Sequence, residues 1–265
     1  MRPPLAACRV LPKTLACPAG LAQRIAVQRC NAPPATVLSC GMTLPRMPQA
    51  VVFDMDGLLF DTETLYVEAA ITAATELGHD VSTEIILRTT GGPWPQTRQL
   101  LLEHFGTAFP VDDFVTVWLR HFGVLAEERL ALKPGVVELL DLLDELRLPK
   151  AIATSSSPRT VQNHLAAHNL VGRFDAIVGA GDYAVGKPAP DPFLTAAGRL
   201  GVAPQACLAL EDSHNGVRSA VAAGMMTVMV PDLLPPTDGI RGLCTFIAGD
   251  LHEVRELILT ASRRC

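Results

Sequence analysis

Short apolar runs alternate with helical patterns along the chain from about residue 50 onward. The runs are too short for helices and are apolar throughout, which is typical of strands covered on both faces. We predict strands at residues 50–54, 150–154, 176–180, 207–211 and 226–230. Helical spacing predicts helices at residues 135–146, 157–168, 191–200 and 215–223. Strands and helices in alternation indicate an α/β fold with a doubly wound parallel sheet.

One interval breaks this alternation, because residues 64–131 contain no convincing strand. Helical patterns occur there at residues 65–77, 96–105 and 112–125, and a GGPWP break lies at residues 91–95. We therefore predict an all-helical domain at residues 64–131. It is inserted into an α/β core domain built from residues 48–63 and 132–265.

The N-terminal segment has a different composition from the rest of the chain. Residues 1–50 contain basic side chains and no acidic one, although the whole chain has a formal net charge of −5. The remaining residues hold 16 of the 22 basic side chains and all 27 acidic ones, a net charge of −11. We predict that residues 1–47 form a basic extension outside the domains. A targeting peptide, a disordered tail and a translation start at Met42 or Met47 are three open interpretations, and we favour the last.

Composition also excludes several classes of partner. No basic block marks a nucleic-acid-binding or polybasic membrane surface, and no stretch approaches the roughly 18 to 20 apolar residues of a membrane span. Cys207, Cys244 and Cys265 are isolated and lack the spacing of zinc ligands. We therefore expect a cytoplasmic, monomeric protein with reduced thiols, whose partner is a small molecule.

Carboxylates gather where the first predicted strand ends, in the stretch VVFDMDGLLFDTE at residues 51–63. Crowded like charges raise each other's pKa, so a bound cation is the usual reason for such a group. Ligands of open parallel sheets bind at the carboxyl ends of the strands, where polar side chains are expected to meet. Three later strands are followed by such side chains: Thr154, Ser155 and Ser156 after the second, Lys187 after the third, and Glu211 with Asp212 after the fourth.

Four ordered motifs carry a resemblance to a known family. FDMDGLLFDTE, ATSSS, GKPAPDPF and LEDSHNGVRSA resemble, in this order and spacing, the motifs of the haloacid dehalogenase-like hydrolase superfamily. The similarity is to its phosphatase and phosphomutase branch, and it covers roughly residues 48–262. It implies a Rossmann-like core, with the helical insertion acting as a cap over the active site.

The resemblance also implies roles for the carboxylates. Asp54 would be the nucleophile that forms an aspartyl phosphate. Asp56 would protonate the leaving oxygen and later activate water. Asp212, the Asp54 carboxylate and the backbone carbonyl of Asp56 would hold Mg²⁺, with Glu211 as a ligand or as an acceptor beside it. A cation there would relieve the repulsion among the carboxylates.

The remaining motifs would bind the phosphoryl group. Thr154 would donate a hydroxyl hydrogen bond to it, helped by the backbone N–H groups of Ser155 and Ser156, and Lys187 would bridge nucleophile and phosphate. The two serines also fit a helix N-cap. His214, inside the fourth motif, is more typical of a helix start and stays outside the catalytic set.

Substrate choice in capped members of this family depends on the cap. Family mutases acting on hexose phosphates carry a His shortly after the DT pair and a Lys and an Arg in the first cap loop. This chain has Tyr66, Thr90 and Trp94 at those places, although Arg88 and Arg98 lie nearby and could substitute. Among the cap aromatics, which otherwise fit a core, Trp94 is the best candidate for substrate contact, and Glu63 and Tyr66 are further cap candidates.

The sequence therefore predicts a Mg²⁺-dependent phosphomonoester hydrolase for a small phosphorylated metabolite, such as a sugar or nucleoside monophosphate. A phosphomutase of the β-phosphoglucomutase type is the main alternative. A dehalogenase is disfavoured because that branch lacks the acid corresponding to Asp56. The helical insertion argues against a phospho-acceptor signalling domain, and the intact motifs argue against a non-catalytic phosphate-binding module.

Overall fold

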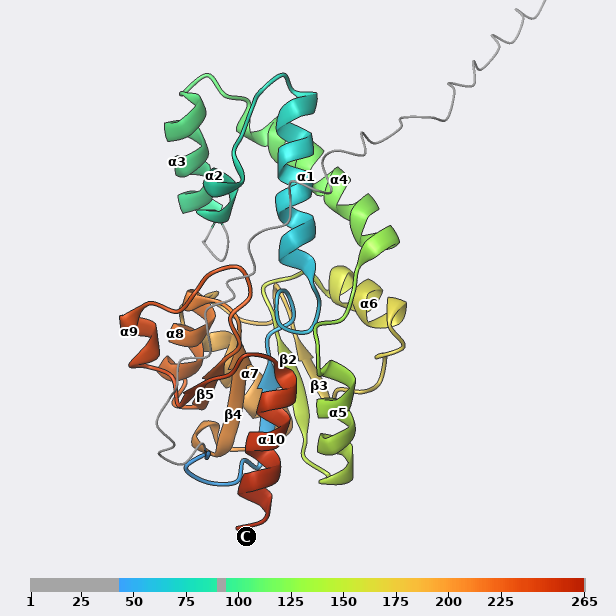
Figure 1. Cartoon of the computed structure of the whole chain (residues 1–265), viewed down its shortest axis with the longest axis vertical. Coiled ribbons are helices and arrows are strands. Elements are labelled where there is room, and N and C mark those ends of the chain that lie inside the picture. The colour runs from blue at the N-terminus through green and yellow to red at the C-terminus, as the bar shows by residue number, and fades with distance from the viewer. Residues whose placement is uncertain (1–42, 90–93, 265) are drawn as a thin grey trace, which may run out of the picture. The chain divides into compact units, whose positions relative to one another are not determined.

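A six-stranded parallel sheet forms the centre of the fold in the computed structural model, which describes residues 43–89 and 94–264. The strand order is β3-β2-β1-β4-β5-β6, and every paired strand runs parallel to its neighbour. The strands are β1 (Ala50–Phe53), β2 (Lys150–Ala153), β3 (Ala176–Val178), β4 (Cys207–Glu211), β5 (Met226–Met229) and β6 (Phe246–Ile247). The predicted α/β class and parallel sheet are confirmed (Figure 1), and β6 is an addition.

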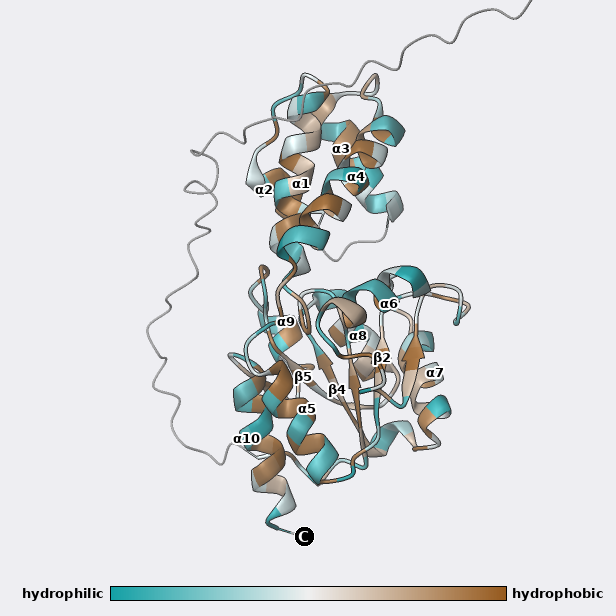
Figure 2. Ribbon diagram, turned by 90° about the vertical axis from the view of Figure 1, so that its right-hand side faces the viewer, coloured by the Kyte–Doolittle hydropathy of each residue, from teal (hydrophilic) through white to brown (hydrophobic). Residues whose placement is uncertain are grey.

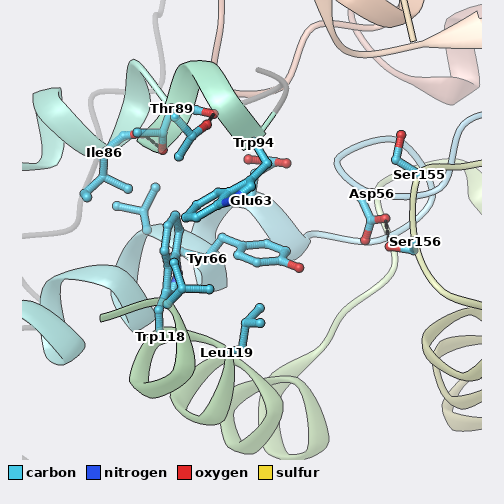
Figure 3. A pocket seen from close by; sticks show the side chains of 13 residues that line it. Asp56, Glu63, Tyr66, Ile86, Thr89, Trp94, Trp118, Leu119, Ser155 and Ser156 are labelled. Carbon is cyan, nitrogen blue, oxygen red and sulfur yellow. Dashed lines mark hydrogen bonds between the residues drawn. The ribbon is translucent and has the colours of Figure 1, made fainter. Parts of the chain in front are cut away.

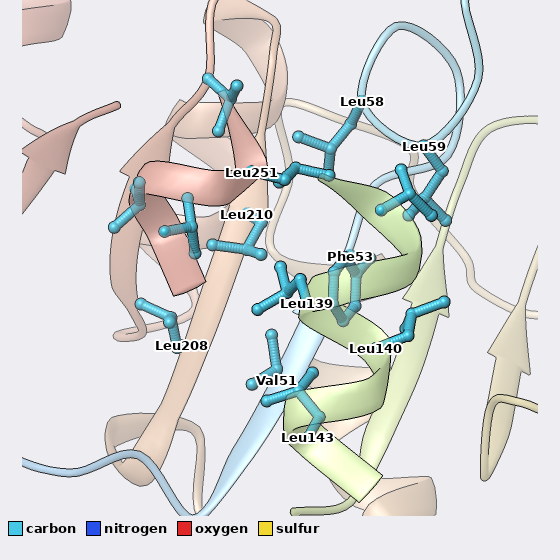
Figure 4. Close-up of a cluster of buried hydrophobic side chains, with 14 of the residues drawn as sticks. Val51, Phe53, Leu58, Leu59, Leu139, Leu140, Leu143, Leu208, Leu210 and Leu251 are labelled. Carbon is cyan, nitrogen blue, oxygen red and sulfur yellow. The ribbon is translucent and has the colours of Figure 1, made fainter. Parts of the chain in front are cut away.

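Alternate residues of the central strands face opposite layers of helices. Val51 and Phe53 of β1 pack in one apolar cluster, whereas Ala50 and Val52 pack in another. The first cluster holds side chains of α5 (Val136–Glu145), α6 (Pro158–Ala167) and α10 (Leu251–Ser262). The second holds side chains of α7 (Asp191–Leu200) and α8 (His214–Ala222). Period-two alternation thus gives each face of the sheet its own core, and Figure 4 shows the first of the two clusters.

The apolar content of the strands explains why the sheet is covered on both sides. All four residues of β1, β2 and β5 and all five of β4 are buried. In Figure 2, β4 and β5 are mostly brown, whereas α10 carries both brown and teal residues. Such helices bury one face and expose the other.

Side-chain caps fix where several helices begin. Ser157 accepts a hydrogen bond from the Thr160 backbone N–H at 3.2 Å and starts α6, and Ser213 accepts one from the Gly216 N–H at 3.1 Å and starts α8. Each cap satisfies a backbone donor that the first helical turn leaves free. The suggestion that Ser155 or Ser156 caps a helix is therefore wrong, because Ser157 holds that position.

Between β1 and α5, the elements formed by the described residues are all helices. They are α1 (Thr62–Glu76), α2 (Thr83–Leu87), α3 (Trp94–Phe105) and α4 (Val111–Arg129). Their apolar side chains form a separate cluster that includes Leu65, Phe114 and Trp118. The inserted helical cap is confirmed, while the domain boundaries at residues 64 and 131 stay a prediction.

Two chain segments connect the cap to the core, and they are hydrogen-bonded to each other. The Asp61 N–H donates to the Ala131 carbonyl at 2.9 Å, and the Lys133 N–H donates to the Leu59 carbonyl at 2.9 Å. The Lys133 ammonium also lies 2.6 Å from Asp232, which follows β5. Pairing of the outgoing and returning segments limits the directions in which the cap can move.

His164 of α6 is buried against aromatic side chains from the cap and from the segment that connects the cap to the core. Its ring centroid lies 5.5 Å from that of Phe60 in the connecting segment and 6.4 Å from that of Phe122 in the cap. The Nδ1 atom is buried and has no hydrogen-bond partner within the described residues. Burial lowers the pKa of His164, and the nearby His168 lowers it further. The site therefore favours a neutral imidazole.

Acid should consequently weaken the fold through His164. Because its folded pKa lies below the unfolded value of 6.5, the unfolded chain takes up the proton first as pH falls. We expect His164→Leu to lose less stability than the wild type between about pH 8 and pH 5 in denaturant titrations. His104→Leu, at an exposed position of α3, is the control. Parallel pH curves for wild type and His164→Leu would contradict this expectation.

Several sequence interpretations fall outside residues 43–89 and 94–264. They include the fate of most of the basic extension, Thr90, the first part of the GGPWP break and Cys265. Across the part of the chain that the structure describes, no helix is long and apolar enough to cross a membrane.

Candidate active site

The sheet order brings the predicted site residues to one edge. Since β1 lies between β2 and β4, the residues that follow these three strands are neighbours. The Asp54 N–H donates to the Leu210 carbonyl of β4 at 2.9 Å, and the Thr154 N–H donates to Val178 of β3 at 2.9 Å. These backbone hydrogen bonds extend the strand ladders by one residue and fix where both side chains emerge.

Three buried carboxylates form the centre of this edge. Asp54, Glu211 and Asp212 each offer one oxygen within 4.8 Å of the others, and all three are buried. Burial raises the pKa of Asp212 well above its usual range, and Asp54 and Glu211 raise it further. Burial also raises the pKa of Glu211 to about 7, although Lys187 opposes the shift. The cluster therefore holds more negative charge than its surroundings stabilise.

Lys187 is the cation nearest to this cluster. Its Nζ atom lies 2.5 Å from Asp54 Oδ1 and 2.5 Å from Glu211 Oε1. Burial alone would lower the pKa of Lys187, but Asp54 and Glu211 outweigh burial and raise it, so the side chain stays charged. No cationic side chain within the described residues pairs with Asp212. The Lys187 ammonium thus pairs with two of the three carboxylates, those of Asp54 and Glu211.

Asp56 points to a different set of partners from Asp54. Its Oδ2 atom accepts hydrogen bonds from the Ser156 hydroxyl at 2.7 Å and from the Thr154 hydroxyl at 3.3 Å. Burial raises the pKa of Asp56, while Ser156, Thr62 and Thr154 oppose the shift through hydrogen bonds. The Asp56 carboxyl lies outside the three-carboxylate cluster, so any part in metal binding would fall to its backbone carbonyl.

Other residues of the site were not anticipated from the sequence. Thr62 accepts a hydrogen bond from the Gly57 N–H at 3.0 Å as well as bonding Asp56. The Ser219 hydroxyl donates to the Ala189 carbonyl at 2.5 Å and so holds the loop that carries Lys187. The sequence offers little indication of these roles, because Thr62 and Ser219 are small polar residues of helices, where such residues commonly have no special role.

Two glycines permit the close approach of the carboxylates. Gly57 has φ +81°, and a Cβ there would lie 2.3 Å from an Asp212 carboxylate oxygen. A Cβ on Gly216 would lie 1.9 Å from the Glu211 carboxyl group. Gly216 was not identified from the sequence, although a glycine in the first turn of α8 inside the fourth motif was an available signal.

A pocket extends from Asp56 into the cap (Figure 3), with a volume of about 440 Å³. Glu63, Tyr66 and Trp94, the three cap candidates, all line it. Trp118 also lines it, although it belongs to the cap core as the sequence suggested. Ser155 and Ser156 lie at the other end, beside Asp56. His214 instead begins α8, where its Nε2 lies 3.0 Å from the Pro235 carbonyl.

The site places the Asp54 carboxylate beside Lys187 and holds a second carboxyl group, that of Asp56, with hydroxyl groups. Together with the cluster of three carboxylates, this arrangement is that of a phosphoryl-transfer enzyme of the capped α/β class. Comparison with known proteins agrees. The model of the haloacid dehalogenase-like hydrolase family matches residues 48–224. The chain belongs to this family, in its capped phosphatase and β-phosphoglucomutase-like branch.

Two sequence relatives carry phosphatase names. "Hexitol phosphatase B" of Escherichia coli K12 is 34% identical over 205 residues, which are 72% of this chain and 86% of that protein. "Probable pseudouridine-5'-phosphatase" of Drosophila melanogaster is 38% identical over 187 residues, 68% of this chain and 80% of that protein. A variant of CbbY from Rhodobacter sphaeroides, solved with xylulose-1,5-bisphosphate, has a TM-score of 0.65 at 27% identity and covers 77% of this chain and 95% of that one. The chain is accordingly a phosphatase.

Proposed function

We propose that the chain hydrolyses monophosphate esters of small metabolites through phosphoryl transfer to Asp54. The observation that carries this proposal is the placement of the Asp54 carboxylate, which lies at the buried strand end with Lys187 at 2.5 Å. Attack by a carboxylate oxygen on phosphorus forms an aspartyl phosphate and breaks the bond to the leaving oxygen. Lys187 offsets charge on the phosphoryl oxygens as they move.

Asp56 supplies and then removes the proton. Burial raises the pKa of Asp56, which favours the protonated carboxyl group that the leaving oxygen requires. Once the leaving group departs, the Asp56 carboxylate accepts a proton from the water that attacks the aspartyl phosphate. Ser156 and Thr154 hold the carboxyl group in place through both steps, since each bonds Asp56 Oδ2.

The carboxylate cluster fits a magnesium ion. Mg²⁺ takes oxygen ligands, and Asp54, Glu211 and Asp212 present oxygens within 4.8 Å of one another. The fit rests on charge as well, because Asp212 is buried without a cationic partner among residues 43–89 and 94–264. We infer that Asp54, Asp212 and the Asp56 carbonyl hold the ion. When bound, the ion supplies positive charge that offsets the carboxylates and the phosphate.

Asp212→Asn should raise thermal stability in the absence of metal and abolish the stabilisation that Mg²⁺ gives. The raised pKa of Asp212 means that its ionised form destabilises the folded state, and asparagine carries no charge. We expect the melting temperature in chelator to rise by several degrees, as about 1 kcal/mol gives in a chain of this size. Asp80→Asn, at an exposed position between α1 and α2, is the control. A wild-type-like Mg²⁺ shift in Asp212→Asn would contradict the assignment.

Hydrolysis is favoured over mutase activity by the cap. Tyr66 occupies the place where hexose-phosphate mutases of this family carry a histidine, and no lysine, arginine or histidine lines the pocket within the described residues. Arg98 lies 3.7 Å from Asp112 and Arg88 does not line the pocket. A bisphosphate intermediate therefore has no cation to hold its second phosphate. The names of the relatives point the same way, toward hydrolysis of sugar and nucleoside phosphates.

A phosphate-release assay tests this function. Sugar, nucleoside and small-acid phosphates are each incubated with Mg²⁺ and with chelator, and hexose 1-phosphates are also followed for isomer formation. Mg²⁺-dependent phosphate release is the expected result. Isomerisation without net release of phosphate would overturn the proposal in favour of a mutase.

We further infer a monomeric enzyme of a reducing, cytoplasmic compartment. Cys207 and Cys244 are free thiols, and burial raises the pKa of Cys207 to about 11, which keeps it protonated and unreactive.

A further inference from the structure

The pocket is built from two chemically different ends. Toward the core it is bounded by Asp56, Ser155 and Ser156, where the phosphoryl group reacts under the proposed function. Toward the cap, apart from Glu63 and two threonines, its lining is aromatic and aliphatic. The volume of about 440 Å³ suits a small metabolite rather than a polymer. A substrate therefore places its phosphate at the polar end and its remaining atoms against the cap.

Three aromatic side chains from three cap helices form the walls of the cap end. Tyr66 of α1 stacks on Phe122 with ring centroids 3.8 Å apart, and the Trp118 Nε1–H donates to the Tyr66 carbonyl at 2.8 Å. These contacts fix the Tyr66 and Trp118 rings before any ligand arrives. In Figure 3 the Tyr66 hydroxyl points toward Asp56, and Trp94 and Trp118 lie on the cap side of it.

Part of this apolar wall is uncovered. Trp94 is 43% exposed and Leu119 is 52% exposed, although both are large apolar residues and both line the pocket. Exposed indole surface in a concave site is favourable for stacking with a flat ring. The exposed apolar surface of Trp94 and Leu119 is therefore suited to contact a flat apolar group of a ligand.

The charge of the pocket excludes anionic leaving groups. Its ionisable lining consists of the acids Asp56 and Glu63 and the phenol Tyr66, with no basic side chain within the described residues. Lys187, the nearest cation, is already paired with Asp54 and Glu211. A second phosphate in the cap would therefore lie near carboxylates without a counter-charge.

The hydroxyl groups of the cap end are also already engaged. The Thr89 hydroxyl donates to the Ile86 carbonyl at 2.6 Å, and the Thr97 hydroxyl donates to the Thr89 carbonyl at 3.5 Å. A polyol chain in this region would find few free donors. Glu63 and the Tyr66 hydroxyl can bond hydroxyl groups only near the middle of the pocket, between Asp56 and the indoles.

We propose that the cap end binds a flat, uncharged ring, so that the preferred substrates are monophosphates of the form phosphate, hydroxylated linker and planar ring, as in nucleoside 5'-monophosphates. This inference rests on the proposed phosphomonoesterase activity. The exposed Trp94 indole stacks with the ring, the buried Trp118 forms part of the wall, and Glu63 and Tyr66 face the linker. Sugar phosphates without a planar ring fill only part of the pocket, and bisphosphates are disfavoured by charge.

A matched pair of substrates tests the inference. Uridine 5'-monophosphate and ribose 5-phosphate share the same phosphoester and sugar carbons and differ in the base. With Mg²⁺ present, we expect kcat/KM to be about tenfold or more higher for uridine 5'-monophosphate, as stacking of one base on an aromatic side chain gives. Ribulose 1,5-bisphosphate is expected to be a poorer substrate than ribose 5-phosphate.

Variants of Trp94 test whether this residue causes the preference for uridine 5'-monophosphate over ribose 5-phosphate. Trp94→Ala should lower kcat/KM for uridine 5'-monophosphate about tenfold more than it lowers the value for ribose 5-phosphate, and Trp94→Phe should retain most of the preference. Val124→Ala is the control, because Val124 is a 51% exposed apolar residue of the same cap that does not line the pocket.

The outcomes separate this inference from the proposed function. Equal or better turnover of ribose 5-phosphate or ribulose 1,5-bisphosphate by the wild type overturns the ring-binding inference while leaving the phosphatase in place. An unchanged preference in Trp94→Ala overturns the role of Trp94. If no phosphate is released from any of these esters or from p-nitrophenyl phosphate, the proposed function itself fails. Even if Trp94→Ala does not fold, the comparison of uridine 5'-monophosphate with ribose 5-phosphate in the wild type tests the ring-binding inference.

Discussion

Asp54→Asn is expected to abolish phosphate release while leaving the fold intact. The amide has nearly the same shape as the carboxylate but cannot attack phosphorus, so turnover should fall by about four orders of magnitude or more. The fold should tolerate the change, because burial raises the pKa of Asp54 and makes its ionised form a cost to the folded state. Lys187 keeps Glu211 as a partner at 2.5 Å, so no buried cation loses all its partners.

The measurement combines turnover with thermal melting. Phosphate release is followed with the best substrate in Mg²⁺, and the melting temperature in chelator should equal or exceed that of the wild type. Asp80→Asn, which removes the same charge from an exposed position between α1 and α2, should change neither quantity much. Near-normal turnover in Asp54→Asn would show that another group is the nucleophile.

The strand and helix pattern was strong enough to predict most of the core. Five strands were predicted within one or two residues because each is a short apolar run, and four of the five are buried along their whole length. β6 (Phe246–Ile247) was missed because two half-buried residues carry no detectable periodicity. α9 (Asp238–Arg241) was missed for a similar reason, since a single turn capped by Thr237 offers too few positions to show a helical pattern.

The site was predictable where its residues follow strands and less so where they act through others. Asp54, Thr154 and Glu211 come together because β1, β2 and β4 are adjacent, a consequence of parallel topology. Thr62 could not be found this way, because its contact with Asp56 depends on how the chain turns back at Gly57. The pocket lining was found only in part, since Glu63, Tyr66 and Trp94 were candidates from the sequence, whereas Trp118 reaches the pocket only through the packing of the cap helices.

Gly216 is the clearest case of a residue whose role appears only in three dimensions. It lies in the first turn of α8, where its N–H donates to the Ser213 cap. The Glu211 carboxyl group occupies the space that a Cβ would fill, at 1.9 Å. That same carboxyl group accepts from the Ser213 hydroxyl at 3.2 Å and contacts Lys187 at 2.5 Å. Glu211 therefore has its present position only because residue 216 has no side chain.

Gly216→Ala should lower both activity and stability. The methyl group forces the Glu211 carboxyl away from Lys187, so Lys187 loses one of the two carboxylates that position it. A misplacement of about 1 Å in a catalytic group lowers turnover by about 100-fold. Overpacking costs about 1 to 3 kcal/mol, which exceeds the roughly 1 kcal/mol that alanine contributes to a helix. The unfolding free energy and kcat with the best substrate are the measurements.

Two further variants show whether the contact with Glu211 is the cause. Gly198 lies inside α7 with nothing within 4 Å of its would-be Cβ, so Gly198→Ala should gain about 0.5 to 1 kcal/mol and keep full activity. Glu211→Asp withdraws the carboxyl by one methylene and makes room for the methyl group. If the clash is responsible, Glu211→Asp costs less activity in the Gly216→Ala background than in the wild type. Additive losses would instead mean that Gly216→Ala acts on the helix and not on the site.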